Sequence, residues 1–302
     1  MAKKASFGRD LMWRIEAFGF DVMSAVLGLL PIDAVSGFGG WLLRTIGPMT
    51  PTHAVVLQNL RWAFPEKSED ERRRIARGVW DNVGRSFAEF PVVHRITPES
   101  GRVEMVGAEH FEEARTLGRP VIFVSGHFAN WELLPAAIVQ SGSHPHMTYR
   151  PANNPYVDAR MKKVRARYGM TRFAPKGENT RDLMQALRKN VPVAFLIDQK
   201  FNEGIMVPFF GRPAPTTTGA ARLALQYNAP IYPMTGQRLG GARFRIIALP
   251  PIHLEKTGDR QRDLEAGTRR LNEFLEECIR AKPEDWFWVH RRWPKADYGS
   301  EP

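Results

Sequence analysis

The sequence contains a single cysteine, Cys278, among 302 residues. One thiol excludes a disulfide within the chain and gives no indication of an oxidising compartment. Cys278 lies at helical spacing with Leu271 and Phe274, which is typical of a packed, unreactive thiol. The chain also lacks a Ser or Cys in a G-x-S-x-G setting, which argues against a hydrolase that works through an acyl-enzyme.

Acidic residues are the scarcer charge, with 32 Asp and Glu against 43 Lys and Arg and a formal net charge of +11. This excess predicts an anionic partner: nucleic acid, an anionic membrane surface or a phosphorylated substrate. The basic residues are scattered through predicted helices and form no known nucleic-acid module, so no nucleic acid is expected. Several Trp neighbour Arg, as in Arg61-Trp62, which fits a headgroup-level interface or plain stacking of Arg on a solvated face.

No apolar run is long enough to cross a bilayer. The stretch Leu11–Leu43 is interrupted by charged residues, and its charge-free parts, 22–32 and 34–43, fall far short of the ~20 residues that a span needs. The acidic interruptions also argue against a cleavable signal peptide. We predict one or two helices lying at the membrane interface and broken at Pro31; a soluble helical layer is the alternative.

Two regions differ in their predicted secondary structure. Residues 1–98 are predicted to be a helical, membrane-interface region, and residues 99–302 an α/β domain with a central, mostly parallel sheet flanked by helices. Helices are predicted at 52–64 and 69–95, the second with a capping box at Ser68 and Glu71. Later strands are predicted at 121–124, 146–149, 193–197, 231–235 and 244–248, and helices at 130–140, 156–168, 180–189, 218–227 and 261–279.

Polar residues follow four of these strands. His127, Arg150, Asp198 and Arg238 each come shortly after a strand ends. Sites in parallel sheets gather at the carboxyl ends of the strands. The pattern therefore predicts one polar site at one edge of the sheet.

His127 and Glu132 are the candidate catalytic pair. An imidazole is suited to take the proton of an attacking hydroxyl at neutral pH, and a carboxylate can fix its tautomer. Within one helix these two side chains would point about 140° apart, so His127 is placed on the turn after a strand and Glu132 in the first helical turn. The alternative is a structural His with an ordinary first-turn Glu. A zinc site is disfavoured, because His144 and His146 complete no ligand set.

These residues resemble a known family. His127-x4-Glu132 is similar to the H-x4-D/E motif of glycerolipid acyltransferases, and TYRPANNPYVD (148–158) is similar to a block of the late lipid A acyltransferases. The resemblance continues, in chain order, through Asp198-Gln199, VPFFG (207–211), TTTGAARLAL (216–225), PIYP (230–233) and W-x-W-x-HRRW (286–293). It covers most of residues 115–294, whereas the N-terminal region resembles the family only in texture.

The resemblance implies a glycerolipid-acyltransferase-like fold and an O-acyltransferase without cofactor or metal. The donor would be an acyl-carrier-protein thioester, with acyl-CoA left open, and the acceptor a hydroxyl of a lipid A precursor in lipopolysaccharide biosynthesis. The protein would then act at the anionic, cytoplasmic face of a bacterial inner membrane. Both the acidic carrier protein and the phosphorylated glycolipid would be attracted to a basic surface.

Four further residues are candidate substrate contacts, each with a structural alternative. Arg150 would hold an anionic group, or pair with Asp198 or Asp158. Asp198 would orient Arg150 or a loop. Thr217, before a predicted helix, would cap that helix or bind an anion. Arg291, in the HRRW segment, would contact a headgroup or belong to a packed C-terminal latch.

Three other functions stay open. An acyltransferase of the same architecture could act on a lysophospholipid, glycerol phosphate or a phosphatidylinositol mannoside. The remaining classes are a basic nucleic-acid-binding protein and a non-catalytic membrane-associated protein.

The backbone N–H groups of the turn after the first core strand are expected to stabilise the oxyanion of the transfer reaction, although the sequence assigns no residue.

Overall fold

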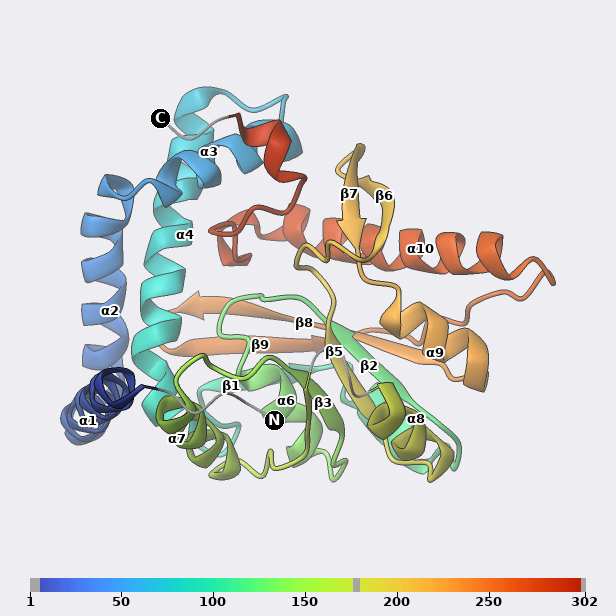
Figure 1. Ribbon diagram of the computed structural model, residues 1–302, viewed down its shortest axis with the longest axis horizontal. Coiled ribbons are helices and arrows are strands. Elements are labelled where there is room, and N and C mark those ends of the chain that lie inside the picture. The colour runs from blue at the N-terminus through green and yellow to red at the C-terminus, as the bar shows by residue number, and fades with distance from the viewer. Residues whose placement is uncertain (1–5, 176–179, 300–302) are drawn as a thin grey trace.

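Short apolar strands form a seven-stranded sheet within residues 6–175 and 180–299, which the computed structural model describes (Figure 1). The strand order is β1-β9-β8-β2-β5-β3-β4. From β8 to β4 all strands are parallel, whereas β9 pairs antiparallel with β8 and parallel with β1. The strands are β1 (Val103–Val106), β2 (Ile122–Ser125), β3 (His146–Tyr149), β4 (Phe173–Pro175), β5 (Val193–Leu196), β8 (Ile231–Gly240) and β9 (Arg243–Ala248). The predicted mostly parallel α/β fold is confirmed.

Helices cover both faces of this sheet (Figure 1). They are α5 (Ala108–Thr116), α6 (Leu133–Gln140), α7 (Pro155–Ala166), α8 (Thr180–Arg188), α9 (Gly219–Tyr227) and α10 (Arg260–Ala281). Ile122 and Val124 of β2 pack in one core cluster with residues of α8, α9 and α10. The intervening Phe123 packs in a second cluster with residues of α5 and α6. Because both faces are buried, β2 is continuously apolar instead of alternating.

Four helices precede the sheet: α1 (Phe7–Leu29), α2 (Ile32–Ile46), α3 (Thr52–Ala63) and α4 (Glu69–Glu89), followed by a 3₁₀ segment, Phe90–Arg95. The break between α1 and α2 includes Pro31, as predicted, because proline cannot donate the backbone hydrogen bond that would continue α1. The capping box of Ser68 and Glu71 opens α4. Within the described residues, no helix combines the length and apolarity that crossing a membrane requires.

Four features of the structure were not predicted from the sequence: β1, β4, α5 and the hairpin of β6 (Ile205–Phe209) and β7 (Arg212–Thr216). The hairpin contains Pro208, Pro213 and Pro215, which normally argue against a strand. A two-stranded ribbon has only edge strands, so prolines are tolerated where their missing N–H would face outward. The strand β1 has the sequence Val-Glu-Met-Val, which a charged residue interrupts, and β4 has only three residues, so neither contains an apolar run of four.

Glycines bring α2 and α4 into close contact at one edge of the molecule (Figure 1). A Cβ atom on Gly84 would lie 2.1 Å from the carbonyl oxygen of Gly39, and one on Gly39 would lie 2.4 Å from that of Gly84. Only residues without a side chain allow this approach. The two glycines therefore set how closely α2 packs against α4.

We expect Gly84→Ala to lower the free energy of unfolding by about 1–3 kcal/mol, since its methyl group must push α2 away. Gly37→Ala on α2 is the matched control, because its Cβ would meet no atom within 4 Å. Its higher helix propensity should leave stability unchanged or raise it by up to about 1 kcal/mol. Denaturant unfolding measures both. Equal stability of the two variants would contradict the tight contact.

Candidate active site

The turn after β2 carries His127. Gly126 is required there, because a Cβ atom would lie 2.8 Å from the Phe128 ring and 3.1 Å from Asp198 Oδ2. The turn also lies against the C-terminal segment: Phe128 forms an antiparallel bridge with Trp286, and the Phe287 N–H donates to the His127 carbonyl at 3.1 Å. The backbone of His127 and Phe128 is thus bonded to the C-terminal segment.

Asp198, just after β5, is the carboxylate that binds His127. Its Oδ1 lies 2.8 Å from His127 Nδ1, and its Oδ2 accepts the His127 backbone N–H at 2.7 Å and the Trp286 indole N–H at 2.8 Å. Asp198 has no exposed surface. Burial alone would raise the pKa of this carboxyl, but the His127 ring and its hydrogen bond outweigh burial and hold the pKa well below its usual range.

An ionised Asp198 fixes the tautomer of His127. A carboxylate only accepts hydrogen bonds, so in the neutral imidazole Nδ1 carries the proton and Nε2 the lone pair. Gln199 Nε2 lies 3.4 Å from His127 Nε2, which places the Gln199 amide on the side of the ring that a substrate would approach. The His127 side chain is 16% exposed, so that side is accessible.

The predicted pairing of Glu132 with His127 differs from the structure. Glu132 lies just before α6, and its carboxylate forms a bidentate ion pair with Arg165 of α7, at 2.6 and 2.9 Å, and accepts from the Tyr168 hydroxyl at 2.8 Å. Both members of the ion pair are buried. The carboxylate is therefore committed to α7, and Asp198 takes the orienting position. Asp198, predicted from the sequence as a candidate substrate contact, is enclosed and contacts His127 and Trp286 instead.

A groove of about 600 Å³ lies near this site, although His127 is not among its lining residues. Its wall includes Trp131, whose ring centroid lies 5.4 Å from that of His127, and the Glu132–Arg165 pair. The remaining wall is mostly apolar and comes from α1, α2 and α4, including Phe20, Met23, Phe38, Leu42 and Phe87. Its dimensions and lining suit a hydrocarbon chain more than a polar ligand.

The other residues predicted to contact substrate do not lie against His127. Arg150 is exposed after β3 and forms no hydrogen bond or ion pair within the described residues, whereas Asp158 pairs with Lys162. The Thr217 hydroxyl accepts the N–H of Gly219, the first residue of α9, at 3.3 Å, although the N-cap residue is Thr218, whose side chain forms no capping bond. Arg291 is partly buried, with its guanidinium 5.8 Å from the Tyr298 ring centroid.

The C-terminal HRRW segment forms a packed latch. Arg292 has no exposed surface and donates to the Pro215 carbonyl and to Thr216 Oγ1. Burial lowers the pKa of His290 to about 4, so that ring is neutral at pH 7. Trp293 of this segment and the two tryptophans just before it, Trp286 and Trp288, are fully buried. Of the two functions predicted for this segment, the structure favours the latch for Arg292 and His290.

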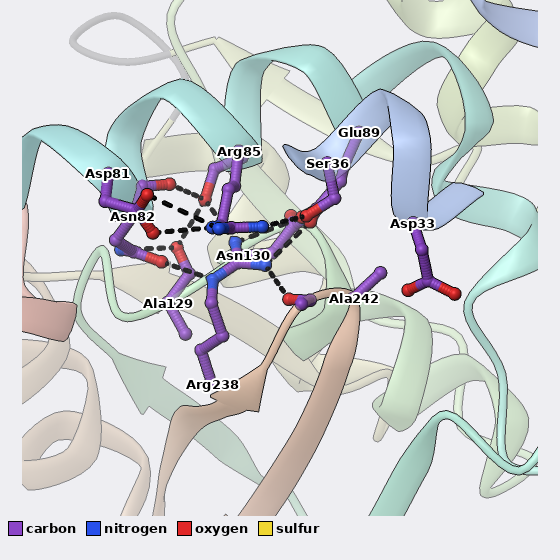
Figure 2. A network of polar contacts seen from close by, with 12 residues as sticks. Asp33, Ser36, Asp81, Asn82, Arg85, Glu89, Ala129, Asn130, Arg238 and Ala242 are labelled. Carbon is purple, nitrogen blue, oxygen red and sulfur yellow. Dashed lines mark hydrogen bonds and ion pairs between the residues drawn. The ribbon is translucent and has the colours of Figure 1, made fainter. Parts of the chain in front are cut away.

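A buried polar network supports the turn from the other side (Figure 2). Asn82 of α4 donates to the carbonyls of Ala129 and Asp285, and Arg238 of β8 forms an ion pair with Glu89 at 2.6 Å. The Asn130 amide donates to Glu89 at 2.9 Å. Residue spacing could not reveal this network, because α4 and the turn are more than 40 residues apart in the chain. Among the described residues, no group of His, Cys, Asp or Glu side chains is arranged to hold a metal ion.

Comparisons with known proteins agree on one family. The family model described as bacterial lipid A biosynthesis acyltransferase matches residues 11–295. The Escherichia coli K12 lipid A biosynthesis lauroyltransferase is 29% identical over 81% of this chain and 80% of its own length. The lipid A biosynthesis myristoyltransferase of the same strain is 28% identical over 77% of this chain and 72% of its own length.

A solved structure, the 1-acyl-sn-glycerophosphate acyltransferase PlsC from Thermotoga maritima, covers 77% of this chain and 98% of its own. The identity is 12% and the TM-score 0.35, values too low to bear on fold or activity.

We expect Glu132→Gln to lower the free energy of unfolding by about 3–5 kcal/mol, because it leaves the Arg165 guanidinium buried without its counter-charge. Glu104→Gln is the matched control, since Glu104 pairs with Arg245 at the surface, and its loss should cost no more than about 1 kcal/mol. Chemical denaturation compares the two variants. A Glu132→Gln protein as stable as Glu104→Gln would show that the buried pair does not brace α7.

Proposed function

Because the chain belongs to the bacterial lipid A biosynthesis acyltransferases, we propose that His127, oriented by Asp198, is the general base of its acyl transfer. Family membership makes the protein an acyltransferase of lipid A biosynthesis. The proposal for its chemistry rests on one observation: a buried carboxylate holds the Nδ1 proton of His127 and leaves Nε2 available beside an apolar groove. A thioester donor and a hydroxyl of a lipid A precursor are the substrates that this arrangement suits.

The proposed reaction proceeds in two steps. The acceptor hydroxyl gives its proton to His127 Nε2 as its oxygen attacks the thioester carbonyl, which forms a tetrahedral oxyanion. Asp198 stabilises the imidazolium that results. The intermediate then collapses, the carbon–sulfur bond breaks, and the leaving thiolate takes the proton from Nε2. An ester and a free thiol are the products, and His127 returns to its starting state.

The groove is proposed to hold the acyl chain. It begins at Trp131 beside His127, so a thioester carbonyl at that end would lie next to Nε2 while the hydrocarbon extends along α1, α2 and α4. Met23, Phe38 and Phe87 line the groove and are also about half exposed. The groove therefore opens onto the molecular surface, where a chain can enter from the side.

Arg150 is the proposed contact for an anionic group of the substrate. It is exposed at the end of β3, at the same edge of the sheet as His127 and Asp198. Its guanidinium suits a phosphate or carboxylate, and a lipid A precursor and a carrier protein both offer such groups. Acyl carrier protein and acyl-CoA are both retained as donors.

The outer face of α1 is proposed to lie on the cytoplasmic surface of the inner membrane. The acidic residues that interrupt its apolar sequence bind α7 and its flank: Asp10 accepts from Tyr156, Glu16 from Asn154 and Asp21 from Arg160. Exposed apolar residues follow one helical face: Leu11, Ile15, Phe18, Val22, Val26 and Leu29. Such a stripe fits an interfacial helix with its apolar side among the acyl chains.

We expect His127→Ala and Asp198→Asn each to reduce acyl transfer at least ~100-fold, because one removes the base and the other the carboxylate that sets its tautomer. The assay supplies purified protein with an acyl-carrier-protein or acyl-CoA thioester and either a lipid A precursor, a lysophospholipid or a phosphatidylinositol mannoside, with product read by mass spectrometry. Thermal unfolding confirms that each variant is folded. Full activity of His127→Ala would end the base assignment, and transfer to a lysophospholipid alone would end the acceptor assignment.

We expect Ile15→Glu combined with Phe18→Glu to weaken binding to vesicles of phosphatidylethanolamine and phosphatidylglycerol at least ~10-fold, since two apolar side chains lose their burial in lipid. Met206→Glu is the control, because Met206 is as exposed as much of α1 but lies on the hairpin of β6 and β7. Cosedimentation measures both. The α1 interface is refuted if the double variant binds as the native protein does.

A further inference from the structure

We propose that Asn82 and Ser86 of α4 are positioning residues for the reaction, which hold the His127 turn in its reactive conformation through the carbonyl oxygen of Ala129. The inference rests on the proposed role of His127 as base. Neither side chain bonds His127 or Asp198 directly. Their effect on the chemistry would therefore pass through the backbone, two residues beyond the base.

Ala129 has a backbone conformation that needs support. Its φ is 47°, in the left-handed region that residues other than Gly, Asn and Asp seldom adopt. Such a conformation is unfavourable for a residue with a Cβ atom and persists only where surrounding contacts impose it. Strain of this kind two residues from His127 makes the supporting contacts relevant to catalysis.

The contacts on Ala129 come from both of its backbone polar groups. Its carbonyl accepts from Asn82 Nδ2 at 3.3 Å and lies 2.9 Å from Ser86 Oγ, whose single proton it shares with the Asn82 backbone carbonyl at 2.8 Å. Its N–H donates to the Asp285 carbonyl at 2.7 Å. Asn82 also donates to that Asp285 carbonyl at 3.2 Å. The Asn82 side chain of α4 therefore bonds both the turn, at Ala129, and the C-terminal segment that lies against it, at Asp285.

Arg238 fixes these two side chains in turn (Figure 2). Its Nε donates to Asn82 Oδ1 at 2.8 Å, and its Nη2 donates to Ser86 Oγ at 3.1 Å. Glu89 neutralises Arg238, and both charges are buried. A buried guanidinium with all its partners in place allows few alternative arrangements. The amide of Asn82 and the hydroxyl of Ser86 are thereby aimed at Ala129.

Loss of this support would let the turn relax toward ordinary backbone angles. His127 would then shift relative to Asp198 and to the end of the groove, and a displacement of about 1 Å can reduce a rate ~100-fold. Substrate would still bind in the groove. A fall in kcat at constant KM is thus the expected signature of positioning.

The test compares Ser86→Ala with Ser36→Ala in the full-length protein, by the acyl-transfer assay with acyl-carrier-protein thioester and lipid A precursor. Both serines are buried, and each hydroxyl accepts from an arginine at 3.1 Å, from Arg238 and Arg85 respectively. Ser36 lies on α2 and does not bond the turn (Figure 2). We expect Ser86→Ala to lower kcat at least ~10-fold with KM within ~2-fold, and Ser36→Ala to leave kcat within ~2-fold.

Two further variants make the result decisive. Ser86→Thr keeps a hydroxyl and should restore most of the kcat lost in Ser86→Ala. Asn82→Asp keeps the acceptor for Arg238 but removes the donors to Ala129, and it should lower kcat in the same way, which provides a second measurement if Ser86→Ala unfolds.

The proposal fails if Ser86→Ala matches Ser36→Ala, if Ser86→Thr is as slow as Ser86→Ala, or if only KM changes, since Ser86 also borders the groove. His127→Ala in the same assay separates the two levels of inference. If His127→Ala abolishes transfer while Ser86→Ala does not slow transfer, only the positioning proposal is wrong. If it retains full activity, the base assignment is wrong as well.

Discussion

A fully buried carboxylate, Asp198, is the constraint on which the site depends. A buried anion is costly unless hydrogen-bond donors surround it, and three donors reach it here, two from His127 and one from the Trp286 indole. The carboxylate follows β5, His127 follows β2, and Trp286 belongs to the C-terminal segment. One charge thus joins three parts of the chain. It also explains why Trp286 is buried, since its indole N–H donates to this carboxylate.

Two buried ion pairs then flank the turn that carries His127. Glu132 and Arg165 fasten its far end to α7, and Glu89 and Arg238 connect α4 with β8 behind it. Replacement of such pairs by apolar residues often leaves stability unchanged, so stabilisation is a weak reason for their presence. Their geometry is a better reason. Each pair is bidentate or multiply bonded, and each fixes the direction in which a helix meets the turn.

The sequence predicts the parallel sheet, most of its helices and the convergence of His127 and Asp198, because these follow from apolar runs and from residues just after strands. It assigns the orienting carboxylate wrongly. Glu132 is five residues from His127, whereas Asp198 is 71 residues away, and local spacing cannot rank a carboxylate that a neighbouring strand brings into contact. The hairpin of β6 and β7 is missed because its prolines are acceptable only in a ribbon of edge strands.

The acidic residues of α1 are a second case in which the sequence pattern alone does not reveal the contacts of a side chain. In sequence they interrupt an apolar stretch and weaken the case for a membrane helix; in the structure they face α7 and leave an apolar stripe outside. Residues of α1 also line the groove that ends beside Trp131. On the proposed function, the same helix would contact lipid on one side and the acyl chain on another. A bilayer-held hydroxyl and an acyl chain could then meet at His127 without either crossing open water, which limits competing hydrolysis of the thioester.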